Sequence, residues 1–185
     1  MNHVSSDLVH RAPIDDASAW TPDDVKRDTD WDVTLGAVEV ADLIAALEAT
    51  HRTGVPLAAI NRDNFPLPNS AGVIKRIRDE LRAGRGFALM HGFPVEGQER
   101  EDIARMYWGF CAHLGIGVTQ NSDAGLIHYV TEGRLRPSQG TRGVGNPGKV
   151  SLHVDLADCT TLLCVQQAVG SPYSQLASST TIHNA

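Results

Sequence analysis

The stretch "KVSLHVDLADCTTLLCV", residues 149–165, tells most about how this sequence folds and where its chemistry lies. Side chains alternate between the two faces of a strand, so Leu152, Val154 and Leu156 are predicted to share one apolar face. His153 and Asp155 then share the opposite, polar face, two positions apart. The stretch therefore predicts a strand with one face in the core and a histidine and an aspartate on the other.

A neutral imidazole and a carboxylate at this spacing can reach a single metal ion. With a second histidine from elsewhere they would form the two-histidine, one-carboxylate triad that binds non-haem iron(II). The H-x-D spacing also occurs by chance, and a cross-strand polar pair without a metal is the competing interpretation of His153 and Asp155.

Composition and charge restrict the class of protein. The 185 residues are 42% hydrophobic and 21% charged, which is typical of one soluble globular domain. Sixteen Lys and Arg against 22 Asp and Glu give a net charge of −6 without a basic stripe, so we expect no nucleic-acid partner. No apolar run approaches the roughly 20 residues that span a bilayer, and the polar start lacks the apolar core of a secretory signal. We therefore expect a cytoplasmic protein without a membrane partner.

The cysteines are three in number, and each lies in an apolar stretch, at Cys111, Cys159 and Cys164. An odd number without C-x-x-C spacing predicts neither a disulfide framework nor a cysteine-based zinc site.

The first half of the chain predicts an arm followed by helices. Residues 1–35 are polar and read as an extended arm anchored by Trp20 and Trp31. A one-sided helix follows from Val40 and ends near Gly54. The segment "NSAGVIKRIRDELRAG" predicts a second helix, with Ser70 as its N-cap and a stop at position 84.

A short buried strand is predicted at 87–90, and then comes the helix of "EREDIARMYWGFCAHLG", which ends at Gly115. From about residue 126 the apolar period changes from 3.6 to 2. The segments "GLIHYVTEG", "KVSLHVDLA", "CTTLLCVQQA" and "SQLASS" are predicted to be successive strands. The fold class is therefore α/β, with helices packed on a sheet.

The Gly-rich segment "GTRGVGNPGKV", residues 140–150, contains G-x-G-x-x-G and nearly spells a P-loop. Both motifs must follow a strand and open a helix, whereas this segment precedes a predicted strand. We interpret it as a loop beside the strand of His153. His128 is predicted to lie near that strand in a structural role, and His183 to open a helix capped by Ser179 or Thr180.

Several ordered segments resemble the TauD/TfdA-like family of iron(II) and 2-oxoglutarate-dependent oxygenases, related to taurine dioxygenase and clavaminate synthase. The resemblance begins near Trp20 and covers most of the chain. It rests on "AWTPDDVKRDTDW", "GRGFALMHGFPV", "YWGFCAHLGIGVTQNSDAGLIHYV", "LHVDLADCTTLLCVQQA" and "SQLASSTTIHN". It implies a double-stranded β-helix, or jelly roll, onto which the helices pack.

The resemblance also implies roles for particular residues. His153 and Asp155 match the proximal histidine and the carboxylate of the iron site, and no catalytic residue beyond the metal ligands is implied. Ser174 falls where the family places a hydroxyl near 2-oxoglutarate. Gln120 and Asn121 match a loop that approaches the active site. The implied cofactor is Fe(II), with 2-oxoglutarate as cosubstrate, for hydroxylation, desaturation or cyclisation of a small molecule.

The family's distal histidine and the arginine that pairs with 2-oxoglutarate lie far beyond the H-x-D strand, where this sequence has no residues. Only 32 residues follow His153 (185 − 153), enough for two or three strands of about five or six residues with their turns. We therefore expect an incomplete jelly roll: an arm at 1–35 and a TauD/TfdA-like domain at 36–185, truncated before its C-terminal strands. Open sheet edges would then favour self-association.

Three functions remain open from sequence. The first is a dioxygenase of this family, of which the chain is an N-terminal portion or a truncated product. The second is a catalytically inactive remnant that acts as a binding or partner subunit. The third, less favoured, is a generic α/β metal-binding domain. The sequence does not specify the primary substrate.

Overall fold

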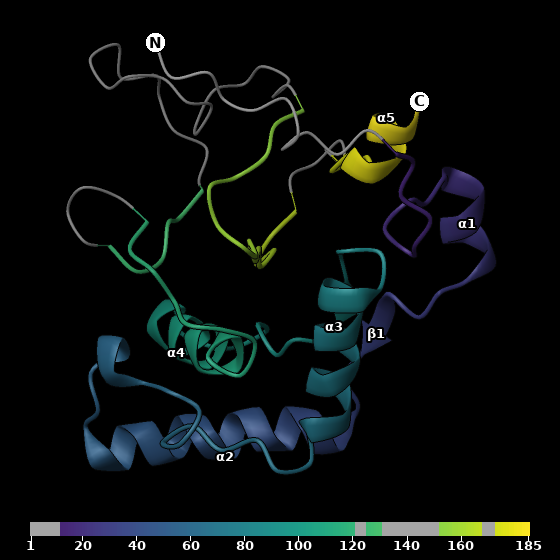
Figure 1. Cartoon of the computed structure of the whole chain (residues 1–185). Coiled ribbons are helices and arrows are strands. Elements are labelled where there is room, and N and C mark those ends of the chain that lie inside the picture. Colours follow the sequence, from purple (N-terminus) through teal and green to yellow (C-terminus); the bar gives the residue numbers. More distant parts are fainter. Residues whose placement is uncertain (1–11, 121–124, 131–151, 168–172) are drawn as a thin grey trace, which may run out of the picture.

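A computed structural model of the chain describes residues 12–120, 125–130, 152–167 and 173–185 (Figure 1). The Gly-rich segment 140–150 and parts of the strands predicted after residue 126 lie outside these ranges. Within them, the helices are α1 (Pro22–Arg27), α2 (Ala37–Thr53), α3 (Ala71–Ala83), α4 (Arg100–Cys111) and α5 (Ser179–Asn184), with a short 3-10 turn, η2 (Leu57–Ala59). The strands are β1 (Asp32–Thr34) and β2 (Leu89–His91).

The two strands form a parallel, two-stranded sheet in which Val33 pairs with Met90. The strand predicted at 87–90 is thus confirmed with a shift of two residues at its start. Its expected burial is wrong, because Leu89 and His91 are exposed and only Met90 turns toward the core. A sheet of two strands has one face on the helices and leaves the other in solvent, so burial alternates.

Helix α2 follows the prediction closely. Leu43 and Leu47 are buried, and Gly54 ends the helix with a left-handed φ of 64°, a conformation that glycine adopts without steric cost. At the other end, the Glu39 carboxylate accepts a hydrogen bond from the backbone N–H of Gly36 at 2.9 Å. The apolar period and the glycine stop were sufficient to predict this helix.

Helix α3 begins after Ser70, as predicted, but the Ser70 hydroxyl does not cap it. The hydroxyl donates instead to Asp42 on α2, at 3.0 Å from Oδ2, and the backbone N–H groups of Asn69 and Ser70 donate to the same oxygen at 2.7 and 2.9 Å. Burial alone would raise the pKa of Asp42, but the hydrogen bonds from Asn69 and Ser70 outweigh it and lower the pKa. A buried carboxylate thus joins α2 to the start of α3.

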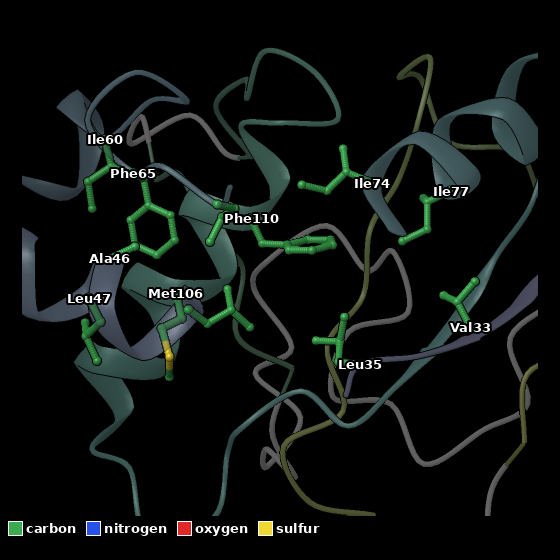
Figure 2. Packing of buried hydrophobic residues seen from close by; sticks show 12 residues of the cluster. Val33, Leu35, Ala46, Leu47, Ile60, Phe65, Ile74, Ile77, Met106 and Phe110 are labelled. Carbon is green, nitrogen blue, oxygen red and sulfur yellow. The ribbon is translucent and has the colours of Figure 1, made fainter. Parts of the chain in front are cut away.

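Helix α4 lies against α2 and carries the centre of the core (Figures 1 and 2). Met106 and Phe110 are buried, and Phe65 from the segment between α2 and α3 is fully enclosed. The helix ends at Cys111, and a turn reaches Gly115, whose N–H donates to the Cys111 carbonyl at 3.1 Å. The side chains labelled in Figure 2 belong to one cluster that gathers α2, α3, α4 and β1 around a single core: Val33, Leu35, Ala46, Leu47, Ile60, Phe65, Ile74, Ile77, Met106 and Phe110.

The N-terminal arm is anchored by its two tryptophans, as predicted. The rings of Trp20 and Trp31 lie 5.2 and 5.4 Å from the ring of Phe87, centroid to centroid. The arm is not extended throughout, because residues 22–27 form α1. The signals for α1 were present in the sequence: Thr21 donates through its hydroxyl to Asp24 at 2.7 Å, and Pro22 occupies the first helical position.

The arm also holds helix α5, which Figure 1 shows beside α1. Asn184 accepts from the Ile14 N–H at 2.9 Å and donates to the Ile14 carbonyl at 2.7 Å. The Ser178 hydroxyl donates to the Ser18 carbonyl at 2.5 Å and accepts from the Thr181 N–H at 2.8 Å, which makes Ser178 the N-cap. The predicted helix is confirmed with its cap one residue earlier than expected, but His183 lies in its last turn and does not open it.

The strands predicted after residue 126 are not present among the described residues of 125–130, 152–167 and 173–178. Leu152, Val154 and Leu156, the predicted core face, are 71%, 86% and 101% exposed. A strand is stabilised by its neighbours in a sheet and by a layer packed on its apolar face, and these side chains have no such layer in the described structure. Within the part of the chain that the structure describes, no helix has both the length and the apolar character needed to cross a bilayer.

Candidate functional site

The two predicted metal ligands do lie together. His153 Nε2 is 3.6 Å from Asp155 Oδ1, and the two side chains are 61% and 54% exposed. Two donors bound at about 2.1 Å in neighbouring positions of one ion lie roughly 3.0 Å apart. The observed separation of the two donor atoms is therefore about 0.6 Å longer than the separation of two ligands on one ion.

The chemistry of the pair also suits a divalent transition metal. An imidazole nitrogen and a carboxylate oxygen are two of the three donors in the facial triad of non-haem iron(II) sites. Among residues 12–120, 125–130, 152–167 and 173–185, no group of three or more His, Cys, Asp or Glu side chains is placed to hold a metal ion. The described residues thus fit two ligands of an iron site and do not supply the third.

No contact that the structure describes joins the predicted 2-oxoglutarate residues to His153 or Asp155. The Gln120 amide donates to the Val118 carbonyl at 2.9 Å, and its backbone N–H donates to the Gly125 carbonyl at 2.6 Å. The hydrogen bonds that the structure gives for Gln120 therefore stabilise the local chain turn. Ser174 is exposed, four residues before the cap of α5, and Asn121 lies outside the described residues.

A contact that the sequence did not predict ties the metal-ligand segment to the helical core. The Tyr107 hydroxyl on α4 lies 2.6 Å from the Thr161 hydroxyl, and Cys111 Sγ lies 3.5 Å from the same oxygen. Burial raises the pKa of the Tyr107 hydroxyl to about 12 and that of the Cys111 thiol to about 11. Both groups therefore keep their protons at neutral pH. The hydroxyl of Tyr107, on an otherwise apolar helix face, is the signal that could have suggested a polar contact.

Other histidines contact residues of the helical part of the chain. His113 Nε2 lies 2.8 Å from the Phe65 carbonyl, which places this half-buried side chain at the edge of the core. His51 on α2 forms a pair with Asp102 on α4, with Nε2 and Oδ1 2.7 Å apart. His128, expected beside the strand of His153, is exposed and lies in no strand. Cys111, Cys159 and Cys164 are free thiols.

The two best-defined hollows on the described surface are not lined by His153 or Asp155. One, of about 410 Å³, is open to solvent and has the Arg100 guanidinium 3.8 Å from the centroid of the Tyr129 ring. The other, of about 250 Å³, lies between the arm and α5; Arg85 lines it, but this guanidinium already pairs with Asp28 at 2.5 Å and Glu80 at 3.3 Å. The Arg100 guanidinium in the first hollow therefore stacks on an aromatic ring, whereas that of Arg85 in the second is held between two carboxylates.

Comparison with protein families gives one match that covers most of the chain. The model described as "Taurine catabolism dioxygenase TauD, TfdA family" matches residues 51–185. The matched region begins within α2 and includes α3, α4, both predicted metal ligands and α5.

Two curated proteins are similar over nearly the whole chain. FR-33289 synthase of Streptomyces rubellomurinus is 25% identical over 177 residues, which are 94% of this chain and 52% of that protein. Taurine hydroxylase-like protein SAT17 of Stachybotrys chartarum is 24% identical over 179 residues, 92% of this chain and 46% of that protein. The chain spans about half the length of the curated relatives it matches.

Proposed function

The chain belongs to the TauD/TfdA family, and from that membership we propose that it contributes to a non-haem iron(II), 2-oxoglutarate-dependent dioxygenase that oxidises a C–H bond of a small molecule. One observation carries the proposal: the family match at 51–185 contains His153 and Asp155, whose donor atoms lie 3.6 Å apart. The name of one relative, a taurine hydroxylase-like protein, is consistent with the same class of reaction.

In this proposal His153 would hold iron(II) through Nε2 and Asp155 through Oδ1. The bound metal supplies the oxidising chemistry, together with 2-oxoglutarate and dioxygen. To bind, the imidazole must be neutral and the carboxylate ionised, so metal affinity should fall on acidification as protons compete for both donors. The exposure of the two side chains leaves room around the ion for further ligands.

Ser174, Gln120 and Asn121 are proposed to hydrogen-bond 2-oxoglutarate or to line its approach. The jelly-roll fold is proposed for residues 126–178 from family membership, with the alternation of apolar side chains at 152–156 in support. The division into an arm at 1–35 and a domain at 36–185, and the cytoplasmic location, stay predictions from sequence.

A second candidate function is a non-catalytic binding role. Several large apolar side chains in the described part of the C-terminal third are exposed, and exposed apolar surface can serve protein association. The described members are Leu152, Val154, Leu156, Leu162, Val165, Tyr173 and Leu176. Self-association through this surface would show as a concentration-dependent molar mass in light scattering, without any requirement for iron.

The deciding experiment is an anaerobic titration of the full chain with Fe(II) and 2-oxoglutarate, followed by the visible charge-transfer absorption of the chelate. We expect a saturable band in the wild type and none in His153→Ala or Asp155→Ala. A chain that develops no band at millimolar ligand, under conditions where it remains folded, contradicts the proposal for this polypeptide.

His51→Ala is the matched control. It removes another imidazole that lies beside a carboxylate, 2.7 Å from Asp102, but on the outside of the helical core. This variant should bind iron as the wild type does. If His51→Ala and His153→Ala reduce the band equally, the assignment of His153 as a ligand is wrong.

A further inference from the structure

The segment that carries His153 and Asp155 has little regular structure to hold it. Residues 152–167 contain no helix or strand, and nearly all of their side chains are exposed. Backbone without a hydrogen-bonded ladder retains conformational freedom worth about 1–2 kcal/mol per residue. The position of the two donors relative to the core therefore depends on the side-chain contacts that the segment makes.

Thr161 makes such contacts with helix α4, which is part of the helical core. Its hydroxyl lies 2.6 Å from the Tyr107 hydroxyl and 3.5 Å from Cys111 Sγ. Tyr107 and Cys111 are four positions apart on α4 and so face the same side of the helix. On the inner side of that helix Met106 is fully buried and Phe110 nearly so.

We propose that Tyr107 is a positioning residue that, through its hydrogen bond to Thr161, fixes the segment bearing His153 and Asp155 on α4. The inference rests on the proposed function for its metal readout. Thr161 is six residues beyond Asp155 and eight beyond His153. Fixing Thr161 shortens the free part of the chain that carries the donors and so reduces the conformations that compete with metal binding.

The chemistry of the contact suits a permanent anchor. Burial holds the pKa of Tyr107 at about 12, so the phenol remains a neutral donor and acceptor across the range in which metal binding is measured. The Cys111 thiol is protonated over that range for the same reason. The anchor therefore adds no charge to the segment and does not titrate together with metal binding.

The test compares Tyr107→Phe and Thr161→Val, each of which removes one hydroxyl and little volume. Tyr129→Phe is the matched control, because its ring lies under Arg100 and its hydroxyl has no part in the anchor. Amide hydrogen exchange, resolved by peptide mass spectrometry, reports on 152–167. Mn(II) binding, followed by the loss of the free-ion magnetic resonance signal, reports on the donors.

In both anchor variants we expect exchange within 152–167 to be about fivefold faster and Mn(II) affinity about fivefold weaker, the size of effect of one net hydrogen bond. The urea midpoint of the helical core should be unchanged, which separates positioning from global stability. The double variant should match Thr161→Val, because that single change already removes the hydroxyl that Tyr107 and Cys111 contact.

Unchanged exchange in 152–167, or faster exchange with unchanged Mn(II) affinity, overturns the positioning role. If the wild type binds no Mn(II), the proposed function and the metal role of the anchor fail together, and the exchange result alone decides whether Tyr107 fixes the segment. The two failures are thus distinguishable within one set of variants.

Discussion

Gly109 on α4 should not tolerate even a methyl group. A Cβ built on Gly109 would lie 2.5 Å from Phe65 Cδ1 and 2.6 Å from Cδ2, well inside the 3.4 Å at which ordinary van der Waals contact begins. Phe65 has no room to retreat, because it is 0% exposed and its carbonyl lies 2.8 Å from His113 Nε2. Gly109→Ala therefore forces a close-packed ring to move.

The magnitude is the difference of two effects. Alanine gains up to about 1 kcal/mol over glycine in a helix interior, while overpacking of a filled core costs about 1–3 kcal/mol. Because the clash is with a fully buried ring, we take the upper part of that cost, about 2–3 kcal/mol, and expect Gly109→Ala to lower the free energy of unfolding by about 1–2 kcal/mol. For a chain of this length that corresponds to a fall of roughly 2–8 °C in melting temperature.

Urea unfolding followed by far-UV circular dichroism measures the effect, and Gly72→Ala is the control. Gly72 lies in the first turn of α3, and no atom lies within 4 Å of the position its Cβ would take. Gly72→Ala should raise stability by a few tenths to about 1 kcal/mol. If Gly109→Ala proves as stable as the wild type while Gly72→Ala behaves as expected, the close packing of Phe65 on α4 is wrong.

Three further outcomes are expected. Asp42→Ala should lower the free energy of unfolding by about 3 kcal/mol, since it leaves buried N–H groups, including that of Ser70, without an acceptor; a loss below 1 kcal/mol in urea unfolding would contradict this. Stability should fall by about 2 kcal/mol as the pH rises from 9 to about 11, because burial raises the pKa of Cys111 to about 11 and the unfolded chain loses the proton first. Cys111→Ala should weaken that dependence, as urea midpoints at each pH would report. Asn184→Ala should speed hydrogen exchange of the Ile14 amide by severalfold; equal rates in the variant and the wild type would refute the contact between the arm and α5.

The helices could be predicted because their signals are local. The apolar positions of α2 recur at helical spacing, and Gly54 stands where the chain must adopt a positive φ. The same two signals predicted the ends of α3 and α4 to within a few residues. Helix α1 was missed, although Thr21, Pro22 and Asp24 carry the signature of a helix start, because a six-residue helix has too short an apolar period to detect.

The contacts that tie distant segments together could not be predicted. Asp42 meets Ser70 across 28 positions, and Tyr107 meets Thr161 across 54. Nothing in the local pattern of either pair specifies its partner, because such contacts depend on how helices pack. Alternation at 152–156 shows which face of a strand would be buried, but it does not specify the neighbouring strand that makes burial possible.

Both faces of residues 152–156 need neighbouring structure to cover them. Oxidation of a C–H bond needs a site from which bulk water is excluded, yet His153 and Asp155 are 61% and 54% exposed. On the other face, Leu156 is fully exposed, although an apolar layer packed on that face would convert the alternation into a strand. Such a layer would hold residues 152–156 in the pleated conformation of a strand. His153 and Asp155 would then lie on one side of that strand at a constant separation. Strand formation, water exclusion and metal affinity are therefore expected to be coupled, since each depends on an ordered neighbour for the same five residues.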